Sequence, residues 1–112
     1  ISKINHQKIL GLILSCISPE NYELNLNEIK NLKVPFGFKL NAFIKTNPKP
    51  NYTGAYNKSK TGNPNEFLGQ RKDLTPIKMA EFAKKFKAAG ATILGGCCET
   101  RPAHIKELSK LI

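Results

Sequence analysis

Residues 91–105 read ATILGGCCETRPAHI, and they give the clearest indication of local structure in the chain. A short apolar run stops at two glycines, which are followed by two adjacent cysteines and then by a proline. Such a run is typical of a buried strand, and proline is favoured at the first position of a helix. The stretch therefore predicts a strand over residues 91–96 that carries two thiols at its tip, and a helix that begins near Pro102.

Two further apolar runs predict two further strands. Residues 9–15 form a continuous run, as expected for a parallel strand covered on both faces, and Cys16 follows at its end. Residues 34–43 form the second run, and Asn41 lies near its end. Because parallel strands of one sheet end at the same edge, these residues should meet the thiols of the third strand there.

Helices are predicted after the first two strands as well. Ser18 and Thr75 each precede a proline, the usual order of a capping hydroxyl and a first helical residue. The first of these helices should end near Leu32, and the second should end at Gly90. Strands that alternate with helices pair in parallel through right-handed crossovers, so we predict an α/β fold.

A long loop is predicted over residues 44–74, where prolines, glycines and asparagines are frequent. Loops of this length are uncommon in compact domains and are usually either functional or disordered. Two interpretations therefore stay open. The loop is either a cover over the strand tips, with Tyr52, Tyr56 and Phe67 excluding water, or a disordered surface insertion.

The composition argues against two classes of partner, nucleic acids and membranes. The formal net charge is +10, but sixteen of the eighteen basic residues are lysines spread along the whole chain. No nucleic-acid-binding motif accompanies this charge, so a solvated lysine-rich surface is the simpler interpretation and no nucleic-acid partner is expected. The longest apolar run is far shorter than the roughly 20 residues that span a bilayer, and no targeting segment is visible, so no membrane contact is expected.

The chain has three cysteines, an odd number that fits a disulfide framework poorly. Adjacent cysteines such as Cys97 and Cys98 seldom bond to each other, because the short peptide between them strains the disulfide. Reduced thiols are typical of a reducing compartment, so we expect the cytoplasm. From the residues alone, the pair is either two small buried apolar side chains or a dithiol that takes part in chemistry.

The same stretch carries a family resemblance. Residues 95–105, Gly-Gly-Cys-Cys-Glu-Thr-Arg-Pro-Ala-His-Ile, resemble the Gly-Gly-Cys-Cys-Gly-Thr-Thr-Pro-x-His-Ile signature of the homocysteine S-methyltransferase family. Glu99 and Arg101 depart from the signature. The segment that ends at Cys16 resembles the family's Gly-x-Asn-Cys segment only in its cysteine, whereas Asn41 and the following alanine agree with a Pro-Asn-Ser/Ala-Gly segment.

The resemblance implies a fold and a reaction. Residues 1–112 would be the last three βα units, strands 6–8, of a homocysteine-binding (β/α)8 TIM barrel, a fragment that is inactive without the rest of the barrel. Cys16, Cys97 and Cys98 would hold a catalytic Zn²⁺. The complete enzyme would transfer a methyl group to the homocysteine thiol and form methionine, with betaine, S-methylmethionine, or a methylated folate or corrinoid as the donor.

Three further residues have expected roles. Asn41 is a candidate substrate-binding residue or fourth zinc ligand. Lys39 would either contact the carboxylate of homocysteine or pair with an acid on one of the missing strands. His104 falls in the first turn of the last helix, where a solvated histidine is the simpler interpretation.

Two other functions stay open on the residues alone. A redox or metal-binding module would use the vicinal dithiol of Cys97 and Cys98 and would not need Asn41. A basic nucleic-acid-binding module would show an affinity that falls steeply with salt.

Overall fold

The structure is a computed structural model that describes residues 6–45 and 65–112. Its elements, in chain order, are η1 (His6–Lys8), β1 (Leu12–Ile17), α1 (Pro19–Ile29), β2 (Phe36–Leu40), α3 (Asn65–Leu68), α4 (Pro76–Ala88), β3 (Ile93–Gly96) and α5 (Pro102–Ser109). The predicted alternation of strands and helices is confirmed. None of the described helices is long and apolar enough to cross a membrane.

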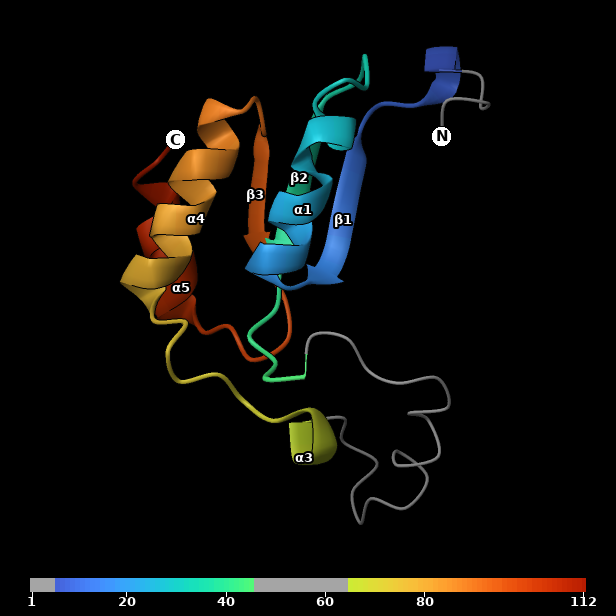
Figure 1. Cartoon of the computed structure of the whole chain (residues 1–112). Helices are drawn as coiled ribbons and strands as arrows, with labels where there is room; N and C mark the ends of the chain where they lie inside the picture. Colours follow the sequence, from blue (N-terminus) through green and yellow to red (C-terminus); the bar gives the residue numbers. More distant parts are fainter. Residues whose placement is uncertain (1–5, 46–64) are drawn as a thin grey trace.

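The strands form one parallel sheet in the order β1-β2-β3 (Figure 1). Both β1 and β2 are shorter than the apolar runs predicted. Leu12 pairs with Phe36, the first residue of β2, and the Leu12 N–H donates to the Pro35 carbonyl at 2.8 Å. Residues before Leu12 therefore have no strand beside them, and Leu10 is 93% exposed.

One face of the sheet packs against α1 and α4 (Figure 1). Tyr22 of α1, Phe38 of β2 and Phe86 of α4 are fully buried, with ring centroids 4.7–5.5 Å apart. Aromatic pairs at such distances each contribute about 0.5–1.5 kcal/mol beyond the area they bury. These three rings therefore join both helices to the middle strand.

Within residues 6–45 and 65–112 the other face of the sheet is open, so this chain itself covers the first strand on one face only. Ile13 is 44% and Ile93 is 36% exposed, and Lys39 is also exposed. Right-handed crossovers in a β1-β2-β3 order place both connecting helices on the same side of the sheet. An apolar run alone does not show whether a second layer is present in the same chain.

The helix starts agree with the predicted caps. The Ser18 hydroxyl accepts from the Asn21 N–H, and the Thr75 hydroxyl accepts from the Lys78 N–H, both at 3.2 Å. The first helix ends at Ile29, three residues before the predicted end.

His104 is buried, so the expectation of a solvated histidine was wrong. Only 7% of the residue is exposed. Its Nδ1 accepts from the Arg101 N–H, and its Nε2 lies 2.9 Å from the Leu74 carbonyl oxygen. Both ring nitrogens are used in fixing the start of α5 to the loop before α4, so neither is free to bind a metal.

The loop predicted over residues 44–74 is closed at its base. Phe43 and Gln70 form an antiparallel bridge, and the Ile44 and Lys45 N–H groups donate to the Gly69 and Leu68 carbonyls, both at 3.0 Å. Residues 46–64, which include Tyr52 and Tyr56, lie outside the described residues. Neither interpretation of the loop is tested.

Candidate metal centre

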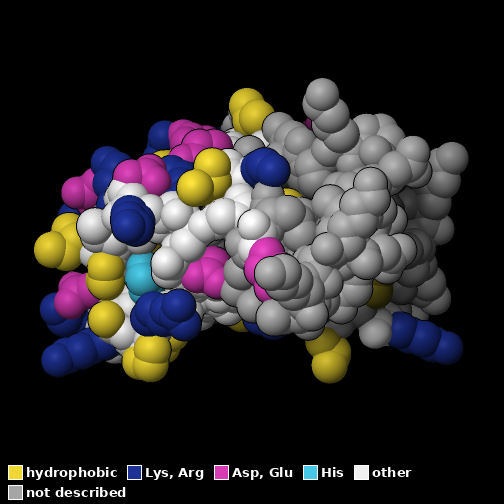
Figure 2. Space-filling view, turned by 90° about the horizontal axis from the view of Figure 1, so that it is seen from below, with side chains coloured by type: hydrophobic (Ala, Val, Ile, Leu, Met, Phe, Trp, Pro, Cys, Tyr) yellow, Lys and Arg dark blue, Asp and Glu magenta, His cyan; other side chains and the backbone are white. Residues whose placement is uncertain are grey.

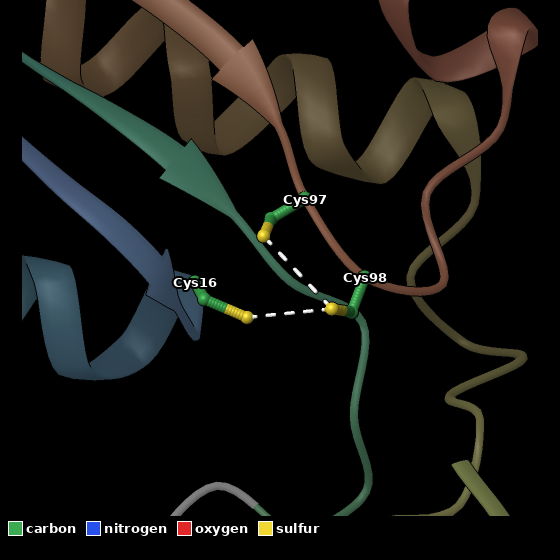
Figure 3. Close-up of side chains that lie close together, drawn as sticks. All are labelled: Cys16, Cys97 and Cys98. Carbon is green, nitrogen blue, oxygen red and sulfur yellow. Dashed lines mark hydrogen bonds between the residues drawn. The ribbon is translucent and has the colours of Figure 1, made fainter. Parts of the chain in front are cut away.

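The three thiols meet at the edge of the sheet where the strands end (Figure 3). Cys16 comes from β1, and Cys97 and Cys98 come directly after β3. The Cys98 Sγ lies 3.6 Å from the Cys16 Sγ and 4.0 Å from the Cys97 Sγ, and all three sulfurs lie within 4.8 Å of one another. The side chains in Figure 3 point toward a common centre.

This spacing fits a tetrahedral zinc ion. Zinc–sulfur bonds of about 2.3 Å at tetrahedral angles place two sulfurs about 3.8 Å apart. The two closest sulfur–sulfur distances, 3.6 and 4.0 Å, bracket that value. Three thiolates also form a donor set that zinc prefers, and they leave a fourth coordination position for another ligand. The residues present therefore fit the metal.

A β-bulge positions the Cys16 thiol. Ser15 pairs with Lys39 and Ile17 pairs with Leu40, so Cys16 is the extra residue between two consecutive partners. Its φ is +55°, in the left-handed region that residues other than glycine rarely adopt. Bulges re-aim side chains near functional sites.

A tight turn after β3 positions the other two thiols. The Cys97 N–H donates to the Leu40 carbonyl at 2.7 Å, and the Cys98 carbonyl accepts from the Ala42 N–H at 3.0 Å. The Thr100 hydroxyl donates back to the Cys97 carbonyl at 2.6 Å. Glu99 has a φ of +63°, which explains why glycine suits this place in the family signature.

The turn leaves no space for a side chain at Gly96. A Cβ at Gly96 would lie 2.4 Å from the Thr100 Oγ1, which is too close for any real contact. A Cβ at Gly95 would meet its nearest atoms at 3.4 Å, an ordinary contact. The two glycines of the motif therefore have different roles, and only the second is required by packing among the described residues.

The thiols differ in acidity. Burial and the neighbouring Cys16 and Cys97 thiols raise the pKa of Cys98 to about 12. Burial also disfavours the Cys97 thiolate, but hydrogen bonds from Cys16 and Cys98 and the charge of Lys39 bring the pKa of Cys97 below its ordinary value. Several thiolates so close together repel one another, and a bound divalent cation offsets that repulsion.

Asn41 and Lys39 flank the thiols in different environments. Asn41 is 6% exposed, and its Nδ2 donates to the Cys16 carbonyl at 2.6 Å. Its Oδ1 accepts from the Phe43 N–H at 3.2 Å. Lys39 lies on the open face between its register partners Ser15 and Gly95. In the part of the chain that the structure describes, Lys39 forms no salt bridge.

Several supporting residues were missed from the sequence. The threonine of the Cys-Cys-x-Thr pattern could have suggested that Thr100 folds back on the thiol turn. Nothing in the sequence, by contrast, indicated a structural role for Arg71. Its guanidinium forms salt bridges with both Glu20 and Asp73 at 2.8 Å. This contact joins the end of the long loop to the first turn of α1, which follows Cys16.

Charges of both signs surround the strand-tip side of the molecule. Figure 2 views the molecule from this side, and in its described part Lys and Arg side chains are interspersed with Asp and Glu. The described part of this face therefore shows no continuous basic patch of the kind that tracks a phosphate backbone.

Comparison with known proteins supports the family resemblance of the Gly-Gly-Cys-Cys stretch. The sequence model of the family described as homocysteine S-methyltransferase matches residues 1–112. Neither the curated proteins nor the solved structures gave a significant match. The family match covers the whole chain, including the Gly-Gly-Cys-Cys stretch and Cys16. The chain belongs to the homocysteine S-methyltransferase family.

Proposed function

We propose that this chain supplies the zinc site of a methyltransferase that converts homocysteine to methionine, with Cys16, Cys97 and Cys98 as the metal ligands. The observation that carries the proposal is the spacing of the three sulfurs, which lie within 4.8 Å of one another. It occurs in a chain that matches this family along its whole length.

The surrounding residues suit a thiol substrate. Zinc, when bound, would keep the homocysteine sulfur deprotonated at neutral pH, where a free thiol with a pKa of about 8.5 is mostly protonated. The three protein thiolates carry a net negative charge that keeps a bound sulfur nucleophilic. Gly95 carries no side chain beside the site, and Lys39 offers a positive charge for the substrate carboxylate. No general base from this chain is needed.

The open sheet face supports the barrel interpretation. In a (β/α)8 barrel the helices lie outside and the inner faces of the strands pack against one another. Here the helices cover one face, while Ile13 and Ile93 on the other face are exposed. We therefore assign the chain to strands 6–8 of the barrel, whose other strands would cover these isoleucines. We also propose a cytoplasmic location, because free cysteines such as these three stay reduced in a reducing compartment.

The test is removal of one ligand at a time in the complete enzyme. Cys98→Ala should abolish both zinc retention, measured by elemental analysis after dialysis, and formation of methionine. Ser15→Ala changes an exposed residue next to Cys16 and should alter neither. Full methyl transfer by the Cys98→Ala enzyme would contradict the proposal.

A dithiol redox module is the second candidate. The sequence suggested the vicinal pair Cys97 and Cys98, whose sulfurs lie 4.0 Å apart, and the sulfurs of Cys16 and Cys98 are closer, at 3.6 Å. Such a module predicts reversible loss of two thiols on mild oxidation without bound zinc. Zinc content measured with and without a thiol-blocking reagent separates the two functions, since only a zinc site loses metal when its thiols are blocked.

A further inference from the structure

The bulge at Cys16 creates a structural demand of its own. Cys16 has a φ of +55° although it is not glycine. This left-handed conformation costs free energy, which neighbouring contacts must offset. The bulge also takes the Cys16 residue out of the strand register, because Ser15 and Ile17 are the residues paired with β2. The Cys16 carbonyl therefore needs a hydrogen-bond donor from elsewhere.

Asn41 supplies that donor. Its Nδ2 lies 2.6 Å from the Cys16 carbonyl oxygen and 3.8 Å from the Cys16 Sγ. Its own backbone N–H donates to the Ile17 carbonyl at 2.9 Å, so Asn41 donates to two consecutive backbone carbonyls, those of Cys16 and Ile17. The side-chain amide is fixed at its other end, since Oδ1 accepts from the Phe43 N–H at 3.2 Å.

We propose that Asn41 is a positioning residue that holds Cys16 in its left-handed conformation and so aims the Cys16 thiol at Cys98. The inference rests on the proposed zinc site. It differs from a direct role as substrate contact or fourth ligand, because it depends on the amide N–H that donates to the Cys16 carbonyl and not on the amide oxygen, which accepts from the Phe43 N–H. Asn41 acts on the metal through Cys16.

A double-mutant cycle tests this indirect action. In the complete enzyme, zinc affinity is measured for the wild type and Asn41→Ala by competition with a chromogenic chelator. For Cys16→Ala and the double variant, whose two remaining thiols hold zinc too weakly to survive dialysis, it is measured by direct titration with zinc. Loss of a supporting hydrogen bond of this kind lowers metal affinity by about 10- to 100-fold. We expect that loss for Asn41→Ala in the wild-type background and a change of less than about twofold in the Cys16→Ala background, because the two residues act as one unit. An equal loss in both backgrounds would overturn the proposal.

A matched variant controls for the loss of any asparagine. Asn25 also donates its side-chain N–H to a backbone carbonyl, that of Asn21 at 2.8 Å, but it lies in α1 away from the thiols. Asn25→Ala should leave zinc affinity unchanged. Asn41→Leu keeps a side chain of similar size without a donor and should lose as much affinity as Asn41→Ala.

A metal-free measurement keeps the two proposals separable and does not require a folded variant. In the wild-type protein without metal, NMR should show slow exchange for the Asn41 side-chain amide protons. Slow exchange in a protein that binds no zinc would leave the positioning role standing and remove the proposed function. Fast exchange, or unchanged zinc affinity in Asn41→Ala, would remove the positioning role and leave the zinc site in place.

Discussion

Tyr22 places a hydroxyl group in the aromatic core, where among the described residues it has no hydrogen-bond partner. A buried polar group without a partner costs about 1–3 kcal/mol. Burial also raises the pKa of Tyr22 from 10.0 to about 12, because the charged phenolate is disfavoured there. The folded protein therefore keeps this proton at a pH where the unfolded chain releases it.

We expect Tyr22→Phe to increase the free energy of unfolding by about 1 kcal/mol at neutral pH. In the wild type, the contribution of the neutral tyrosine is complete below pH 10 and is lost as the pH rises toward 12, a decline of about 2.7 kcal/mol. The Phe variant should show a correspondingly weaker decline. Urea unfolding at several pH values measures both effects. Lower stability of the variant at neutral pH would show that the hydroxyl has a partner.

The two glycines of the motif give a second residue-scale prediction. Gly96→Ala places a methyl group against the Thr100 Oγ1 at 2.4 Å, so the turn that presents Cys97 and Cys98 must shift. Zinc affinity should fall by at least about tenfold. Gly95→Ala meets only ordinary contacts and should change the affinity by less than about twofold. Equal effects of both substitutions would show that the Thr100 contact does not shape the site.

Single residues also mark the limit of prediction from sequence. The three ligand candidates were identified because strand ends of a parallel sheet converge and because the motif resembled a family signature. The bulge at Cys16 was not predicted, because nothing in the apolar run of residues 9–15 indicates that a left-handed residue follows it. The hydrogen bond from the Asn41 amide to the Cys16 carbonyl depends on that bulge, so it could not be predicted from the sequence either.

Helix α5 begins without the usual side-chain cap, and a histidine in its first turn makes the stabilising contacts instead. Arg101 precedes its first residue and makes no side-chain cap hydrogen bond, whereas His104 accepts from the Arg101 N–H and reaches the Leu74 carbonyl. A helix of 8 residues is too short to be stable alone, so its position depends on such contacts.

His104→Ala should lower the free energy of unfolding by about 2 kcal/mol, because it leaves a buried carbonyl and a helix-start N–H without partners. Chemical denaturation measures the change. Lys106→Ala, on an exposed position of the same helix, should stay within about 0.5 kcal/mol of the wild type. Similar values for the two variants would mean that the histidine contacts do not stabilise α5.

Element order and helix starts were predictable because they depend on local chemistry. Ser18 and Thr75 cap their helices as a hydroxyl before proline predicts. Strand ends were less predictable, since β1 begins only where β2 offers a partner. The burial of His104 depends on Leu74, which lies 30 residues away, and no local pattern contains that contact.

At the scale of the whole molecule, the open sheet face decides behaviour in solution. Ile13 of β1 and Ile93 of β3 are both register partners of Gly37 in the middle strand, and both are exposed. In the described residues, β1 and β3 also have no strand on their outer edges. Such edges pair readily with other chains. The 112-residue chain produced alone should therefore self-associate rather than unfold cooperatively as a monomer.

Sedimentation and thermal unfolding measure this behaviour. Ile13→Ser should reduce self-association, because it removes apolar surface from the open face. Ile77→Ser is the matched control: Ile77 is 67% exposed on α4, and its replacement should have little effect. A sharp monomeric transition in the wild-type chain would show that the open face needs no cover.

The closed base of the long loop has a consequence for the history of the gene. The backbone bonds of Ile44 and Lys45 to Gly69 and Leu68 bring the two ends of the intervening segment together. Doubling the length of a loop between fixed ends costs only about 0.6 kcal/mol. Codons can thus be gained or lost between these two points while the reading frame is kept and the strand ends stay in place. The same point is a natural site for grafting a fluorescent reporter or an affinity tag.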